Sequence, residues 1–133
     1  MYIIIAGCGR IGSMLATELS NEGHDVVIID HDKSKLDTLG SGFNGIRSLG
    51  VEFDNDVLIG AGIEQADVFY AMSADDNINI VAAQVAGRIF KVKRVIARVS
   101  DPSKQFLYEQ MGLETICPTT LTVQMSKEWI DKV

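Results

Sequence analysis

Short apolar segments alternate along the chain with segments whose apolar residues recur every three or four positions. Residues 2–6 and 26–29 are continuous apolar runs rich in Ile and Val, which is typical of strands buried on both faces of a sheet. The segment between them repeats its apolar residues at helical spacing, at Ile11, Met14, Leu15 and Leu19. Gly23 then follows, a common residue for ending a helix. The first thirty residues therefore predict a strand, a helix and a second strand that ends at Asp30.

The same alternation continues to the C-terminus. We predict four further strands, at residues 46–51, 67–71, 95–99 and 115–117. Helices are predicted at residues 33–39 and 56–61, after Asp75 or Asp76, between Asp101 and Gly112, and from Thr119 or Thr120 onward, since Pro118 is expected to interrupt the chain. The long helix after Asp76 carries Ile78, Val81, Ala82, Val85 and Ala86 on one face, which could belong to the core or to an interface. Six strands alternating with helices predict one α/β domain over residues 1–133, with a doubly wound, mostly parallel, Rossmann-like sheet.

Composition narrows the class of protein. The chain has 133 residues, of which 47% are hydrophobic, and this is the size and apolar content of one folded domain. No apolar run approaches the roughly 18 residues that a membrane span needs. The run at residues 2–6 is not preceded by the basic residues with which a signal peptide begins. The two cysteines, Cys8 and Cys117, form no CxxC pair. We therefore expect a single domain in the reducing cytoplasm.

Charge is unevenly distributed. The net charge is −6, which argues against a general nucleic-acid-binding protein. Through Gly87 there are 4 Lys and Arg against 13 Asp and Glu, whereas from Arg88 onward there are 8 against 5. The basic residues gather in one short stretch, at Arg88, Lys91, Lys93, Arg94 and Arg98. This stretch is interpreted either as a solvated helix end and strand start or as a docking face for an acidic partner.

A glycine motif lies between the first predicted strand and the first predicted helix. It reads Gly7-Cys8-Gly9-Arg10-Ile11-Gly12 and fits the pattern GxGxxG. Gly7 permits a tight turn, Gly9 lets the backbone approach a pyrophosphate, and Gly12 lets the helix pack closely on the strand. Free N–H groups at the helix start would face the anion. The motif predicts a dinucleotide or nucleotide site, unless this is a Rossmann-like turn that has lost its ligand.

Asp30 follows Gly12 by 18 residues, near the spacing of about 20 expected for the acid that binds the ribose of a nucleotide. Its charge would repel a 2′-phosphate, and the next residues, His31 and Asp32, supply no Arg to compensate. The expected ligands are therefore NAD(H), ATP, ADP or AMP, with NADP disfavoured. His31 either stacks on adenine or is a surface histidine. Arg10 either contacts a phosphate or points to solvent.

Other candidates lie after the fourth and fifth predicted strands. Met72 and Ser73 border the cleft where the strand order is expected to reverse, so they are predicted to contact the distal part of the ligand. Arg98 would bind a distal phosphate or pair with Asp101. Asp75 and Asp76 are interpreted as helix caps. No HExxH, GxSxG, P-loop or metal-ligand cluster is present, so neither catalytic nor metal-binding residues are assigned and we do not expect an enzyme.

Together these motifs resemble one family, the RCK or Trk-type N-terminal domain (TrkA N-terminal, or KTN, domain) that regulates potassium channels and transporters. The matching segments are the glycine motif with its internal Arg10, Val27-Ile28-Ile29-Asp30, Ala61 to Asp67, Asp75-Asp76-Asn77-Ile78-Asn79, Val95 to Pro102, Gly112-Leu113-Glu114 and Cys117-Pro118-Thr119. The resemblance covers nearly the whole chain. It implies a regulator that binds NAD(H) or an adenine nucleotide, forms homo-oligomers, and acts on a membrane-embedded potassium transporter or channel from the cytoplasmic side.

By this resemblance Arg10 contacts phosphate, Asp30 the ribose, and the Met72-Ser73 loop the distal part of the ligand. One position departs from the family pattern: Val51 stands where the family often has an Asp that helps to read adenine. Backbone groups of Val51 and Glu52 would then serve instead. The chain ends where family members usually continue into a smaller C-terminal lobe, so we expect only the N-terminal lobe, with a last helix that needs a partner to cover it.

Two other interpretations remain open from the residues themselves. The chain could be the cofactor-binding domain of an NAD-dependent oxidoreductase whose catalytic part lies elsewhere. It could also be a degenerate Rossmann domain used only for assembly.

Overall fold

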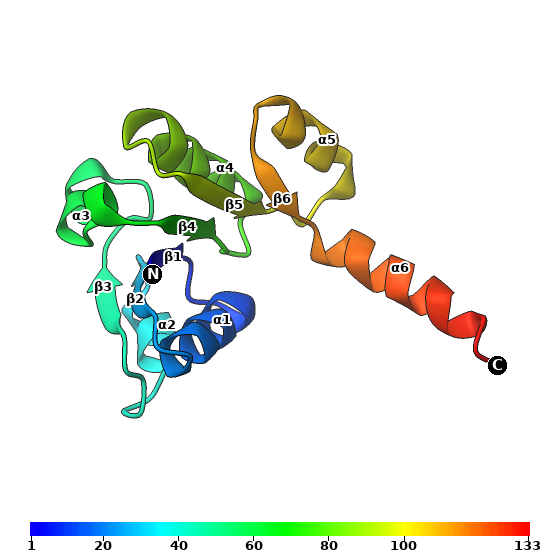
Figure 1. Cartoon of the computed structure of the whole chain (residues 1–133), viewed down its shortest axis with the longest axis horizontal. Coiled ribbons are helices and arrows are strands. Elements are labelled where there is room, and N and C mark those ends of the chain that lie inside the picture. The colour runs from blue at the N-terminus through cyan, green and yellow to red at the C-terminus, as the bar shows by residue number, and fades with distance from the viewer.

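Six parallel strands form one sheet in the computed structural model, which describes residues 1–133. The strands are β1 (Tyr2–Ala6), β2 (Asp25–Asp30), β3 (Ile46–Leu49), β4 (Val68–Ala71), β5 (Arg94–Arg98) and β6 (Glu114–Ile116). Their order across the sheet is β3-β2-β1-β4-β5-β6 (Figure 1). This is the strand order of the doubly wound dinucleotide-binding fold. The predicted fold class is confirmed.

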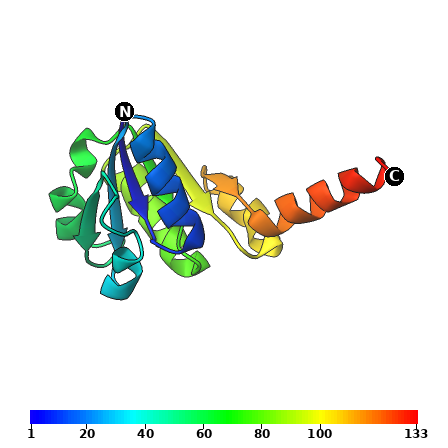
Figure 2. The same cartoon turned by 90° about the horizontal axis from the view of Figure 1, so that it is seen from below.

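Helices cover both faces of the sheet. They are α1 (Arg10–Asn21), α2 (Lys33–Asp37), α3 (Asn55–Gly60), α4 (Asp76–Gln84), α5 (Pro102–Gln110) and α6 (Pro118–Ile130), with a 3₁₀ turn at Ile63–Gln65 and a π-helical turn at Val85–Ile89 that continues α4. Side chains of α1 and α2 pack with Ile3 and Ile5 on one face. Side chains of α3 and α4 pack with Ile4 and Ala6 on the other (Figure 2). The core therefore consists of two apolar layers separated by the sheet.

The centre of the sheet explains why β1 reads as a continuous apolar run. Ile3, Ile4, Ile5 and Ala6 are each at most 1% exposed, although alternate residues of a strand point to opposite faces. β1 pairs with β2 on one side and with β4 on the other. The order in which successive strands join the sheet reverses between β1 and β4, because β2 and β3 lie on one side of β1 and β4, β5 and β6 lie on the other. Ligands of open α/β sheets bind at the carboxyl ends of the strands at such a reversal.

Small residues make up most of the buried positions of α1 and α4. In α1 the buried residues are Gly12 and Ala16, while Met14 is 66% exposed. In α4 they are Asn79, Ala82 and Ala83. Small residues let a helix approach the neighbouring backbone closely: a Cβ at Gly12 would lie 1.9 Å from the Gly7 oxygen. The larger apolar residues are displaced to the sides: Ile11 and Val81 are exposed, and Ile78 and Val85 are half-buried.

The C-terminal boundaries also correct the sequence prediction. β6 ends at Ile116, Cys117 is the N-cap of α6, and Pro118 is the first residue of that helix rather than an interruption. Proline suits this position because the N–H of the first helical residue has no acceptor within the helix, so proline gives up no hydrogen bond there. β3 ends at Leu49 instead of residue 51, and α2 ends at Asp37 instead of residue 39. The other boundaries agree within two residues.

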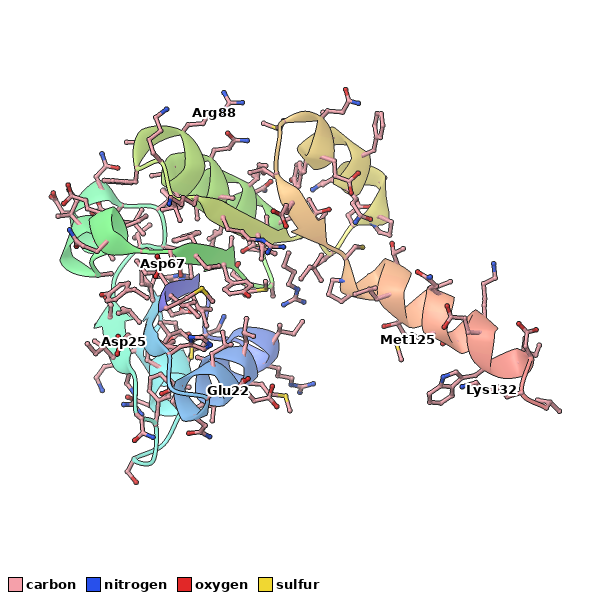
Figure 3. The ribbon with its side chains drawn as sticks, viewed as in Figure 1. Glu22, Asp25, Asp67, Arg88, Met125 and Lys132 are labelled. Carbon is pink, nitrogen blue, oxygen red and sulfur yellow. The ribbon has the colours of Figure 1, made fainter.

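The last helix stands apart from the sheet. α6 extends away from β6 and has no buried residue (Figures 1 and 2). Met125 is directed from it into open space (Figure 3). No helix is both long and apolar enough to span a bilayer. The apolar side chains of α6 are therefore largely exposed: Leu121 49%, Val123 56%, Met125 53%, Trp129 64% and Ile130 71%.

The basic stretch lies on the π-helical turn and the start of β5. Arg88 is labelled in Figure 3 at the outer end of the α4 segment. Arg94 pairs with Glu114 across the sheet edge, with 3.0 Å between Nη2 and Oε2. Arg88, Lys91 and Lys93 are exposed. Exposed basic residues at a helix end and a strand start agree with both interpretations, so a docking face for an acidic partner stays a prediction.

Candidate functional site

The glycine motif is held tightly against two other loops. Gly7 adopts a φ of +111°, and a Cβ at Gly7 would lie 2.4 Å from the Ser73 nitrogen. A Cβ at Gly12 would lie 1.9 Å from the Gly7 oxygen. Both positions therefore require glycine for close backbone packing. A Cβ at Gly9, by contrast, would meet nothing within 4 Å, so this side of the turn is open to an approaching ligand.

The start of α1 offers backbone N–H groups. Its N-cap is Gly9, which has no side chain to accept a hydrogen bond, and Ser13 N–H is donated to Gly9 O at 2.9 Å. In contrast, α2 to α5 are each capped by an Asp carboxylate. The exposed Arg10 is the first residue of α1. Uncapped N–H groups at a helix start attract anions.

Asp30 lies at the carboxyl end of β2 and is only 2% exposed. Its Oδ2 accepts the Cys8 N–H at 2.8 Å, and its Oδ1 accepts the Asp32 N–H at 2.9 Å. The carboxylate thus joins the glycine turn to the loop after β2. Each oxygen retains capacity for a second donor, as a ribose hydroxyl would require.

Glu52 supplies a second buried carboxylate that sequence reasoning missed, because only its backbone was considered. It is 1% exposed, and its Oε1 accepts the His31 N–H at 3.0 Å and lies 2.6 Å from His31 Nδ1. The hydrogen bond with Glu52 and its negative charge raise the pKa of His31 above the ordinary value, and the nearby Asp30 adds to this effect. Val51 points elsewhere and is 43% exposed. The only sequence signal was an acid three residues beyond the end of a strand.

A cavity of about 480 Å³ lies at this edge of the sheet. It is lined by Asp30, His31, Lys35, Glu52, Ser73, Ala74, Asp75 and Ile78. Loops after β2, β3 and β4 therefore meet there, as the reversal of strand order requires. A larger hollow of about 1080 Å³ runs along α6 and holds none of the predicted site residues.

The loop after β4 is anchored by Asn79, a buried residue of α4 to which sequence reasoning gave no role. Asn79 Oδ1 accepts the Ser73 N–H at 2.9 Å, and its Nδ2 donates to Ser73 O at 2.8 Å and to Arg98 O at 3.0 Å. Met72 N–H is donated to Ala6 O, and the Met72 side chain lies in the apolar core. Contact of Met72 with a ligand is thereby restricted to its backbone, whereas Ser73 lines the cavity.

The remaining acidic residues at this edge have structural partners. Asp75 caps α4 through the N–H groups of Asn77 and Ile78, as predicted. Asp76 instead accepts the N–H groups of Ser100 and Asp101. It thereby ties α4 to the loop after β5.

Two further predicted residues are brought only partly to the site. Arg98 forms no ion pair with Asp101, which instead caps α5, and Arg98 Nε is buried without an acceptor. Cys8 is buried in the glycine turn, where burial, and secondarily the charge of Asp30, raise its pKa to about 11. Its Sγ lies 3.3 Å from Lys35 O. A thiol in this state is a poor nucleophile.

Comparison with known proteins places these features in a family. The TrkA-N domain model matches residues 3–118. The chain is 46% identical to the Trk system potassium uptake protein TrkA of Streptomyces coelicolor over 92% of its own length and 55% of that protein. It is 37% identical to a TrkA homolog of Pyrococcus abyssi, over 84% of its own length and 49% of that protein. The chain thus spans about half the length of the curated relatives it matches.

Solved structures show the same fold at low identity. The TrkA-N domain of the inner membrane protein YbaL of Escherichia coli aligns with a TM-score of 0.85 at 17% identity, over 96% of this chain and 95% of that one. The AMP-bound C-terminal domain of Kef from Shewanella denitrificans aligns at 0.80 and 21% identity, over 98% and 80% of the two chains. The GsuK channel bound to NAD aligns at 0.73 and 22% identity, over 88% and 21%.

The names of the sequence relatives are those of potassium-uptake components, which agrees with the expectation of a non-enzymatic protein and gives no support to the oxidoreductase alternative. The family expected from the glycine motif, Asp30 and the Asp75 to Asn79 segment is confirmed. This chain belongs to the TrkA-N domain family.

Proposed function

We propose that this chain is the nucleotide-binding N-terminal lobe of a regulator of potassium transport. It binds NAD(H) or an adenine nucleotide and transmits occupancy to a membrane-embedded transporter or channel, acting from the cytoplasmic side. One observation carries this proposal. The buried Asp30 accepts the N–H of Cys8 in the glycine turn, directly before the uncapped start of α1, and both lie where the strand order reverses.

The phosphates would lie at the glycine turn. The open face at Gly9 lets them approach the backbone, the N–H groups at the start of α1 donate to their oxygens, and Arg10 adds a bidentate cation. The ribose hydroxyls would donate to Asp30. A 2′-phosphate would meet the charges of both Asp30 and Glu52, which strengthens the expectation that NADP is disfavoured.

The other predicted residues surround this core. His31 with the backbone of Val51 and Glu52 would flank the adenine, because the loops after β2 and β3 meet in the same cavity. Ser73, the Met72 backbone and Arg98 would face the distal part of the ligand. Solved relatives in fold carry AMP, ADP and NAD, which supports this class of ligand.

Transmission would use the contacts of Asn79. This residue holds the backbone of Ser73 and of Arg98, so a ligand that moves the loop after β4 also shifts the end of β5. A ligand changes an equilibrium only by binding the two arrangements with different affinity. We therefore expect occupancy to alter how the domain contacts its partners.

Calorimetry tests the ligand class. The purified chain is titrated with NADH, NAD, ATP, ADP, AMP and NADPH, and NADPH is expected to bind most weakly. Asp30→Asn retains an acceptor for the Cys8 N–H but loses the charge, so it should weaken binding at least tenfold, about the effect of losing one charged hydrogen bond. Asp37→Asn, an exposed carboxylate on α2, is the matched control. A folded protein that binds none of the six below millimolar concentration would contradict the proposal.

Homo-oligomerisation is part of the same proposal, and its evidence is the exposed apolar face of α6. Light scattering after gel filtration should give a mass above 14.5 kDa for the natural chain. Met125→Asp should shift it toward the monomer, whereas the change Lys127→Ala on the same helix should not.

A further inference from the structure

Three side chains from the loops after β2 and β3 meet at the ribose end of the cavity. Asp30, His31 and Glu52 each place one potential ligand atom within 4.8 Å of the others. His31 Nδ1 lies 2.6 Å from Glu52 Oε1 and 3.8 Å from Asp30 Oδ1. The sequence alone showed no metal-ligand cluster, because His31 and Glu52 are separated by a helix and a strand.

The second oxygen of Glu52 has no partner. Oε1 accepts from His31, but no donor of the protein reaches Oε2, although the side chain is only 1% exposed. A buried carboxylate oxygen without a hydrogen bond is unfavourable. Glu52 lines the same cavity as Asp30 and His31, so its carboxylate has unused acceptor capacity that a cation bound there would satisfy.

The carboxylates are also oriented as metal ligands usually are. Asp30 is fixed by the N–H groups of Cys8 and Asp32, and Glu52 by the N–H of His31. Such hydrogen bonds to the ligating groups hold metal sites in shape. The rigid part of the cluster therefore consists of two acids, while the ring of His31, which is half exposed, can adjust.

The spacing fits an ion after a small adjustment. Two ligand atoms, each about 2.1 Å from a common ion, lie roughly 3.0 to 3.4 Å apart. The two measured separations, 2.6 and 3.8 Å, lie on either side of this range. An ion would require the imidazole ring to move away from Glu52 and toward Asp30, and the 52% exposure of the His31 side chain leaves it room to move.

We propose that Asp30, His31 and Glu52 bind a divalent transition-metal ion of the Zn²⁺ class. One imidazole nitrogen with two carboxylates is a donor set that Zn²⁺ accepts, whereas Mg²⁺ and Ca²⁺ prefer oxygen ligands only. Water would complete the coordination. Lys35 lines the same cavity and opposes the cation, but the two acids outweigh its single charge.

Occupancy of this site would regulate the nucleotide site, and this consequence depends on the function proposed above. The ion takes Asp30 Oδ1 and draws His31 toward it, so the ribose loses one of the two Asp30 oxygens that could accept its hydroxyls. Metal and nucleotide therefore exclude each other.

Metal binding is measured directly by calorimetry on the full chain after treatment with a chelator. The reference protein carries His24→Ala, because the Met1 amino group lies 3.1 Å from His24 Nδ1 and this pair could bind Zn²⁺ by itself. We expect one equivalent of Zn²⁺, not displaced by excess Mg²⁺. Glu52→Gln and His31→Ala should each weaken binding more than about tenfold. Asp37→Asn should leave it unchanged.

Spectroscopy provides an independent check. Co²⁺ in place of Zn²⁺ should show no thiolate charge-transfer band, since neither cysteine belongs to the site. Such a band, or equal Zn²⁺ affinity in the reference protein and in His31→Ala, would overturn the proposal. If Glu52→Gln fails to fold by circular dichroism, His31→Ala still decides the matter because the ring is half exposed.

Titration with NADH in the presence and absence of Zn²⁺ separates the metal-site proposal from the nucleotide-binding proposal. Zn²⁺ should lower the apparent affinity for NADH in the reference protein but not in His31→Ala, which also controls for chelation of Zn²⁺ by NADH. Binding of Zn²⁺ without any binding of NADH supports the metal site and contradicts the nucleotide function. Binding of both without competition overturns the mutual exclusion.

Discussion

The strands at the glycine turn and the helix α6 are both rich in apolar residues, yet they differ completely in burial. Ile4, Ile5 and Ile28 are 0% exposed, because helices cover both faces of the sheet. In α6, Trp129 is 64% and Ile130 71% exposed. Local pattern produces a strand or a helix in each case. Burial depends on whether another element of the chain lies opposite.

The same contrast extends to polar groups. At the carboxyl ends of the strands, buried Asp30 and Asn79 accept hydrogen bonds from, or donate them to, the backbone of other loops. In α6 only Thr119, in the first turn, bonds a distant residue, the carbonyl of Ser100. Farther along the helix the polar contacts are local, such as Ser126 with the carbonyl of Thr122. A single helix of 13 residues gains little stability from local hydrogen bonds. The carboxyl ends of the strands should therefore resist unfolding far better than α6, and the following substitutions test this difference.

Gly12→Ala should have the largest effect. Alanine favours helices over glycine by up to about 1 kcal/mol, but its Cβ would lie 1.9 Å from Gly7 O. The clash dominates, and we expect a loss of about 4 kcal/mol or more, measured by urea denaturation. Gly9→Ala is the control, because its Cβ meets nothing within 4 Å. Similar losses in the two variants would mean that the turn is not tightly packed.

Ile28→Ala and Ile130→Ala compare the two regions directly. Ile28 is fully buried, so its truncation should cost about 3 kcal/mol. Ile130 is 71% exposed, and its truncation should cost less than about 0.5 kcal/mol in dilute solution. Both values come from urea denaturation at one low protein concentration. A cost for Ile130→Ala that rises with protein concentration would show that a second copy covers α6.

Asn79→Ala tests the polar part of the comparison. It leaves Ser73 N–H and O and Arg98 O without their partner, so we expect a loss of about 2 kcal/mol. Faster hydrogen exchange at Ser73 should accompany it. Asn77→Ala, an exposed residue of the same helix, should change neither quantity. Equal behaviour of the two variants would remove Asn79 from its anchoring role.

The smallest expected effect is that of acid on the exposed start of α5. The Ser103 hydroxyl, and then the Ser103 N–H, lower the pKa of Asp101. A carboxyl whose pKa falls on folding stabilises the folded state above its unfolded pKa, and this contribution disappears as the pH falls through the folded pKa. The natural protein should therefore lose slightly more stability below about pH 4 than Asp101→Asn does. Identical pH profiles in urea denaturation would contradict the capping contribution.

Much of the fold could be predicted because its signals are local. The run at residues 2–6, the glycine motif and the cap Asp75 each depend on neighbouring residues only, and all appear as expected. Pro118 was misjudged because a proline that ends a strand also suits the first turn of a helix. Helical spacing alone does not show which apolar residues face the sheet, since Met14 recurs at that spacing and is 66% exposed.

In the candidate site, too, some features follow from local sequence and others only from the tertiary structure. The sequence by itself determined the doubly wound order, the glycine turn and the place of Asp30, since strand–turn–helix signals and the spacing of 18 residues are properties of one continuous segment. Only the tertiary structure decided that Glu52 turns inward beside His31, that Asn79 joins two loops, and that α6 remains uncovered. These features depend on which strand ends become neighbours in the sheet, and no local pattern encodes the orientation of a side chain toward a distant loop.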